Sequence, residues 1–120
     1  MAITIAIRRI YEAPSKEDGY RVLVDRLWPR GLTKEAAAID EWAKDLSPSA
    51  DLRKWYSHDP EQWPEFQRRY KQELKENAAV VAAFVKAQHS KKRITLLYAS
   101  KSEEYNQAIV LQHYLAPLFK

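Results

Sequence analysis

Apolar residues along the chain predict three β-strands. Isoleucines alternate with less apolar residues over 3–8, which is the period-two pattern of a strand. The segments 20–24 and 93–99 instead have continuous apolar centres, Val-Leu-Val and Ile-Thr-Leu-Leu. Such runs are typical of strands that helices cover on both faces. The pattern therefore predicts a small sheet between helical layers.

Capping residues and apolar spacing predict the helices. Thr33 can cap a short helix over 34–38, and Ser47-Pro48-Ser49 is a start signal for another. Asp59-Pro60-Glu61-Gln62 is the clearest start, with Asp59 as cap, Pro60 in the first helical position and Gln62 completing a capping box. It predicts a long helix over 60–76.

Three other segments complete the prediction. Residues 39–46 fit a short strand or a helical turn, and a helix over 78–88 either continues the preceding one or breaks near Asn77. Ser102 is expected to cap the last helix, with Glu103 and Glu104 in its first turn.

Strands separated by helices predict a single α/β domain over 1–120, a small layered fold with a short, mostly parallel sheet flanked by helices. Parallel sheets bind ligands beyond the carboxyl ends of their strands. These ends are expected at 25–31 and 99–102.

Composition excludes several kinds of chemistry. The absence of cysteine excludes disulfides and thiolate catalysis, and two glycines are too few for a phosphate-binding glycine loop. The three histidines have no metal-ligand spacing, so we predict no metal site and no cofactor. No segment resembles a membrane span or a signal peptide, which predicts a cytoplasmic protein.

The net charge of +4 arises mainly in 66–93, which holds eight basic and two acidic residues. This segment is either a solvated helix face with a basic turn or a surface for nucleic acid.

The stretch Asp25–Gly31 (DRLWPRG) is the strongest candidate site. Arg26 and Arg30 suit a phosphate or carboxylate, and Trp28 offers a stacking face. The structural alternative is that Asp25 pairs with an arginine and Trp28 closes the core.

His58 is the second candidate, as a general acid or base beside a helix start. A surface histidine, or one bonded to the helix start, is the commoner outcome at such a position, and Asp59 suits an N-cap. With Asp25 as the other candidate catalytic residue, we expect ligand contacts from Arg26, Trp28, Arg30, Trp55, Arg69, Tyr98 and Asn106. Each has a structural alternative: Arg69 can pair with Glu65, and Asn106 can tie down a loop. Trp42 and Trp63 are expected in the core, and Trp28 and Trp55 at the mouth of a pocket.

Several motifs resemble the YeaO-like branch of the DUF-488 family: DRLWPRGL (25–32), Asp40 to Ser49 as D-x-W-x-K-x-L-S-P-S, LRKWYSHDP (52–60), F-x-x-R-Y from Phe66, and TLLYA (95–99). The resemblance implies a small bacterial cytoplasmic α/β protein and no particular reaction. Relatives commonly read E-H-N-H-A where this chain reads Glu104-Tyr105-Asn106-Gln107-Ala108. If the two missing histidines bind metal or move protons in relatives, this chain lacks that function. If they are peripheral, the site at Asp25–Arg30 is intact.

These observations leave three hypotheses. The chain is an enzyme with acid/base chemistry on a small anionic or nucleotide-like substrate, a non-catalytic module for nucleic acid or nucleotides that uses 66–93, or an interaction protein whose tryptophans only form core. The first requires Arg30, Trp55 and His58 to share one pocket.

Overall fold

The computed structural model describes residues 3–57 and 59–119. Its sheet has the order β1-β4-β2-β3, and every neighbouring pair is parallel. The strands are β1 (Thr4–Arg9), β2 (Tyr20–Leu23), β3 (Glu41–Trp42) and β4 (Arg93–Tyr98). The predicted α/β class with a parallel sheet is therefore confirmed.

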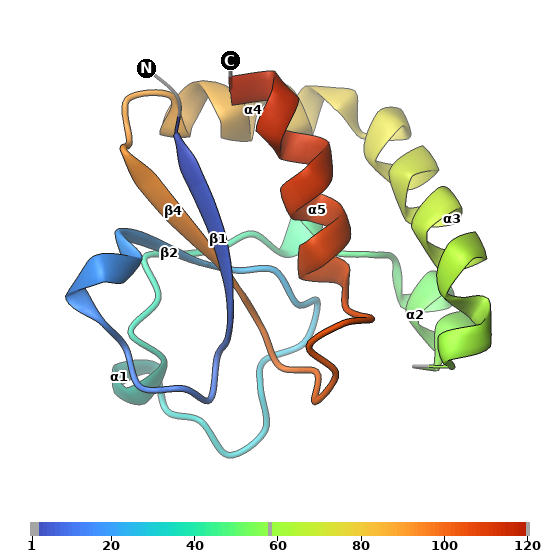
Figure 1. Ribbon diagram of the computed structural model, residues 1–120, viewed down its shortest axis with the longest axis horizontal. Coiled ribbons are helices and arrows are strands. Elements are labelled where there is room, and N and C mark those ends of the chain that lie inside the picture. The colour runs from blue at the N-terminus through green and yellow to red at the C-terminus, as the bar shows by residue number, and fades with distance from the viewer. Residues whose placement is uncertain (1–2, 58, 120) are drawn as a thin grey trace.

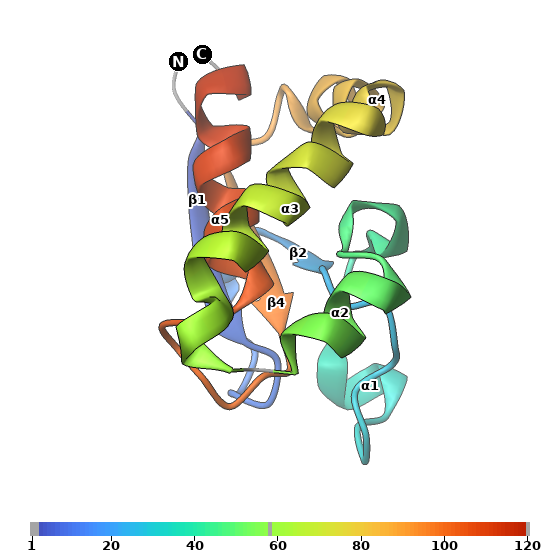
Figure 2. The same cartoon turned by 90° about the vertical axis from the view of Figure 1, so that its right-hand side faces the viewer.

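The helices are α1 (Lys34–Ala37), α2 (Ala50–Tyr56), α3 (Trp63–Glu76), α4 (Ala78–Gln88) and α5 (Gln107–Leu115). Short 3-10 turns lie at Lys16–Asp18, Lys44–Leu46, Pro60–Gln62 and Ala116–Phe119. Figure 1 shows α3 and α5 on one side of the strands and α1 on the other. α5 packs on β1 and β4, and α3 crosses over α5 (Figure 2).

The sheet buries side chains on both faces, as its continuous apolar runs predict. Val22 and Leu96 point into the larger core, which α2 to α5 complete. Leu23 and Leu97 point to the opposite face and form a smaller core with Ile10 and Ala37. Neighbouring residues of β2 and β4 thus serve different cores, because side chains alternate across a strand.

Most of the predicted helix starts are confirmed. Thr33 caps α1 and Ser49 caps α2 through hydrogen bonds from Ala36 N–H and Leu52 N–H. Asp59 accepts from Glu61 N–H, but it caps the 3-10 turn Pro60–Gln62, and α3 begins at Trp63 rather than at residue 60 as predicted. Gln62 does not close a capping box. Its amide instead donates to the carbonyl of Trp55 at 3.1 Å, which ties α2 to the start of α3.

The question left open at Asn77 is settled by a break between α3 and α4. The Asn77 N–H donates to the carbonyls of Glu73 and Leu74, and its side-chain amide donates to the Asp45 carbonyl at 3.1 Å. In the other ambiguous segment, 39–46, both alternatives occur in turn: the short strand β3, then a 3-10 turn.

The predicted start of the last helix was wrong. α5 begins at Gln107, and its cap is Asn106, whose Oδ1 accepts from Ile109 N–H at 3.1 Å. Ser102 caps a preceding turn by accepting from Tyr105 N–H at 3.0 Å. Glu103 and Glu104 therefore lie in an exposed loop before the helix.

Within residues 3–57 and 59–119, no helix combines the length and apolarity that a membrane crossing requires.

Candidate functional site

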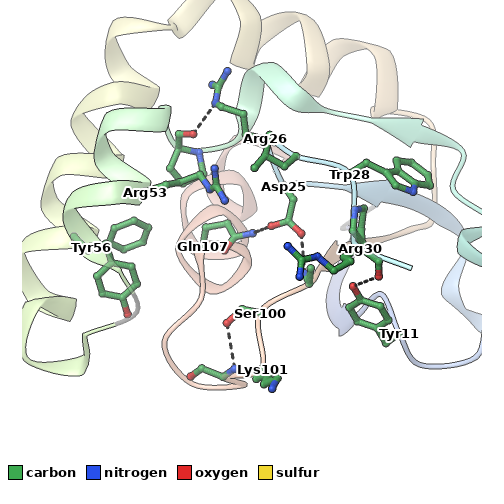
Figure 3. Close-up of a pocket in the computed structure, with 16 residues that line it drawn as sticks. Tyr11, Asp25, Arg26, Trp28, Arg30, Arg53, Tyr56, Ser100, Lys101 and Gln107 are labelled. Atoms are coloured by element: carbon green, nitrogen blue, oxygen red, sulfur yellow. Dashed lines mark hydrogen bonds between the residues drawn. The ribbon is translucent and has the colours of Figure 1, made fainter. Parts of the chain in front are cut away.

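A cavity of about 680 Å³ lies beyond the carboxyl ends of β2 and β4, which is where a parallel sheet is expected to bind a ligand. We call it the strand-end cavity. Figure 3 shows its walls, which come from segments far apart in sequence. Its lining residues are Tyr11, Asp25, Arg26, Leu27, Trp28, Pro29, Arg30, Pro48, Arg53, Tyr56, Phe66, Ala99, Ser100, Lys101, Ser102 and Gln107.

Asp25 is the only acidic residue among these lining residues. Its Oδ2 accepts from Ala99 N–H at 2.8 Å, and its Oδ1 accepts from the Gln107 amide. Burial raises the pKa of Asp25, although these two donors and the nearby charge of Arg53 act in the opposite direction. Each carboxylate oxygen is thus already held by a donor (Figure 3).

Arg26 and Trp28 line the cavity but use their polar groups to hold the fold. Arg26 donates through Nε to the Pro48 carbonyl at 2.9 Å. The Trp28 indole donates to the Leu32 carbonyl at 2.7 Å and contacts Trp42 edge to face, with ring centroids 5.5 Å apart. Both side chains therefore build the wall.

Arg30, Arg53 and Lys101 are the exposed cations of the cavity. Within the described part of the chain, none of these side chains makes a hydrogen bond or an ion pair. The Arg30 backbone is held in place, because its carbonyl accepts from the Tyr11 hydroxyl at 2.8 Å. The cavity thus presents three available cations on a fixed framework.

Trp55 and Arg69 lie outside the strand-end cavity. The Arg69 guanidinium stacks on the Trp55 ring, 4.1 Å from its centroid, and donates to Glu65 at 2.8 Å. The expected Arg69–Glu65 pair is confirmed, and Arg68 joins it. Hydrogen bonds from these two arginines lower the pKa of Glu65 to about 2.

Tyr98 and Asn106, the other two residues predicted to contact a ligand, are buried and do not line the cavity. Tyr98 is 4% exposed and belongs to the larger core. Asn106 is 1% exposed, and its side-chain amide donates to the Ser102 carbonyl at 2.9 Å. These contacts match the alternative in which Asn106 ties down a loop.

His58 lies outside the described residues, so its predicted catalytic role stays a prediction. Because Trp55 does not line the cavity that holds Arg30, the expected convergence of Arg30, Trp55 and His58 in one pocket is not seen in the described part of the chain.

Sequence reasoning missed Gln107, Arg53 and Tyr56 as cavity residues. Gln107 had one signal, since it stands where relatives commonly carry a histidine. Arg53 and Tyr56 lie in the motif 52–60 that carries the family resemblance, but their place in the cavity depends on the packing of α2 against the strand ends, which is a tertiary feature. Among residues 3–57 and 59–119, no group of three or more His, Cys, Asp or Glu side chains is placed to hold a metal ion.

Comparisons with known proteins place the chain among bacterial relatives. The uncharacterized protein YeaO of Escherichia coli is 38% identical over 119 residues, which cover 97% of this chain and 100% of YeaO. The uncharacterized proteins Rv3073c of Mycobacterium tuberculosis and Mb3100c of Mycobacterium bovis are each 46% identical over 76 residues. These residues make up 63% of this chain, which spans 64% of each mycobacterial protein.

No solved structure matches the chain. The family model described as "Inactive DUF488-N3 subclade" matches residues 4–120. With YeaO similar over nearly the whole length, the chain belongs to the DUF488 family, in the subclade that carries this description.

Proposed function

We propose that this chain binds a small anionic ligand in the strand-end cavity and does not catalyse a reaction there. The observation that carries the proposal is the charge of the cavity wall. The side chains of Arg30, Arg53 and Lys101 make no hydrogen bond or ion pair among the described residues, and the single carboxylate, Asp25, is already held by two donors. Guanidinium groups suit phosphate or carboxylate oxygens because their donors match that planar geometry.

The size and lining of the cavity support a small-molecule ligand. Its volume of about 680 Å³ lies within the ~300–1,000 Å³ of ligand pockets. Trp28, Tyr56 and Phe66 give it aromatic walls. A ligand with an anionic group and a flat apolar part fits this combination.

Two points favour binding over acid/base catalysis. Asp25 faces the Gln107 amide and the Ala99 N–H, so neither of its oxygens is left without a donor. The matching subclade is also described as inactive.

The basic segment 66–93 supports nucleic-acid binding less well. Arg68 and Arg69 pair with Glu65, and Lys91 lies over the Tyr20 ring at 4.7 Å from its centroid. The charges are spread over α3, α4 and the start of β4 and line no common cavity with the strand ends.

A melting-temperature screen tests the proposal. Inorganic phosphate, sugar phosphates and nucleoside monophosphates are added to the wild type and to Arg30→Ala and Arg53→Ala. A ligand at 100 times its Kd should add about 2.7 kcal/mol to the free energy of unfolding. Each cavity variant should lose most of that gain.

Arg93→Ala is the matched control, because Arg93 is an exposed arginine at the opposite end of β4 and does not line the cavity. It should keep the full shift. If no anion stabilises the wild type, or all three variants respond alike, the proposal is wrong.

A further inference from the structure

Gln107 is a buried amide side chain among the residues that line the strand-end cavity. It is 9% exposed and is the first residue of α5. Its Nε2 donates to Asp25 Oδ1 and to the Val24 carbonyl at 3.4 Å. Both acceptors lie at the end of β2, so they fix the position of the amide.

The same contacts fix which way the amide faces. Rotating it by half a turn would place Oε1 against the Asp25 carboxylate and the Val24 carbonyl, which offer no proton while Asp25 is ionised. Nε2 therefore points to β2, and Oε1 points away from these acceptors.

Gln107 Oε1 is an available acceptor. No hydrogen bond to it occurs within the described residues. In that part of the chain, every buried side-chain nitrogen or oxygen has a partner. Oε1 therefore retains some accessible surface, and Gln107 itself lines the cavity.

The cavity thus offers two unlike kinds of polar contact. Arg30 and Arg53 are exposed cations, whereas Gln107 Oε1 is a neutral acceptor on a buried side chain. Aromatic walls, including Tyr56 and Phe66, belong to the same cavity. A matching ligand carries an anion, a flat ring and a hydrogen-bond donor on that ring. Several cations match a dianionic phosphate better than a carboxylate, which carries a single charge.

We propose that the ligand is a nucleoside monophosphate whose base carries an exocyclic amino group, with the phosphate at Arg30 and Arg53 and the amino group donating to Gln107 Oε1. This assignment rests on the proposed function and adds the class of ligand and a specificity-determining residue. Gln107 would select by hydrogen-bond direction, because its free atom accepts and cannot donate.

Calorimetric titration of the wild type with two matched pairs of nucleotides tests the assignment. Adenosine 5′-monophosphate is compared with purine riboside 5′-monophosphate, and cytidine 5′-monophosphate with uridine 5′-monophosphate. Each pair has the same charge, and only the first member of each carries the amino group. In at least one pair, the amino-bearing nucleotide should bind about three- to tenfold tighter, the range expected for one hydrogen bond.

Gln107→Leu removes the acceptor and should bring that ratio close to one. Because this change also deprives Asp25 of a donor, the folding of the variant is checked by circular dichroism, and the wild-type comparison stands without it. Arg53→Ala should weaken both members of the pair by the same factor and leave their ratio unchanged.

The outcomes separate this assignment from the proposed function. Equal binding within both pairs, with loss of binding in Arg30→Ala and Arg53→Ala, overturns the role of Gln107 and leaves anion binding in place. A preference that persists in folded Gln107→Leu also overturns that role. If none of the four nucleotides binds, the nucleotide assignment is overturned. If the phosphates in the melting-temperature screen also fail to stabilise the protein, the proposed anion site is overturned too.

Discussion

At the scale of single residues, Gly19 and Gly31 both adopt positive φ angles, of 66° and 77°, but their surroundings differ. A Cβ at Gly19 would collide with the backbone carbonyl of Arg93, whereas a Cβ at Gly31 would have no atom within 4 Å apart from those of its two chain neighbours. Gly31→Ala should therefore cost only the backbone term of about 1–2 kcal/mol. Gly19→Ala should cost about 2–5 kcal/mol, because overpacking adds about 1–3 kcal/mol. Urea unfolding of both variants measures the difference, and equal losses would contradict the collision.

The raised pKa of Asp25 predicts how the free energy of unfolding depends on pH. Because burial raises its pKa in the folded protein, the folded state binds the proton more tightly than the unfolded chain. Its contribution to stability should fall as pH rises from the unfolded pKa of about 3.9 through the folded pKa. Asp25→Asn does not ionise and lacks this fall. The free energy of unfolding of the variant minus that of the wild type should thus increase from pH 4 to pH 7. A constant difference, or one that decreases, would contradict the raised pKa.

At the scale of elements, a buried ionic network joins the loop after β1 to β2 and α1. Asp18 is 2% exposed and accepts from Arg8 at 2.9 Å and from Arg21, itself 5% exposed. Arg21 also donates to the carbonyls of Ala37 and Ala38 at the end of α1, at 2.8 and 2.9 Å. Although burial opposes it, hydrogen bonds from Ser15, Arg8 and Arg21 hold the pKa of Asp18 below its usual value.

Asp18→Asn should therefore destabilise the fold by about 3–5 kcal/mol at pH 7, because it leaves buried guanidinium charge without its partner. The deficit should shrink below about pH 4, where the wild type loses the same interaction as Asp18 is protonated. Glu17→Gln removes the same charge from the neighbouring exposed residue and should change the free energy of unfolding by less than about 0.5 kcal/mol. Denaturant unfolding of both variants at pH 7 and pH 3 measures these changes in the free energy of unfolding. Equal changes for the two substitutions would rule out a structural role for the network.

Local signals predicted most element boundaries, and they failed where two caps compete. Thr33 and Ser49 cap α1 and α2 as expected, whereas Asp59 caps only the 3-10 turn before α3. Before α5, Ser102 and Asn106 are both good caps, only four residues apart. Packing decided between them, because Asn106 is buried and binds both the loop and the helix, whereas Ser102 closes a turn.

At the scale of the whole molecule, the strand order decides where the site lies. β4 is last in sequence but lies between β1 and β2, which brings Ala99 and Gln107 to Asp25 across 74 and 82 residues. The sequence placed Asp25, Arg26, Trp28 and Arg30 at a strand end, and all four line the cavity. Trp55 and Arg69 were expected beside them but contact each other outside the cavity.

The sequence by itself determined the strands, most helix caps, the α/β class and the strand ends as the place for a site. These features depend on side-chain periodicity and on bonds within a few residues, so they can be read locally. Only the tertiary structure decided which cations remain available and that Gln107 faces Asp25. The sequence gives no reason to treat Arg26 and Arg30 differently. In the structure, Arg26 donates to the Pro48 carbonyl, whereas the Arg30 side chain has no partner among the described residues. That difference arises because the partner lies on another segment, and its position follows from how the chain packs.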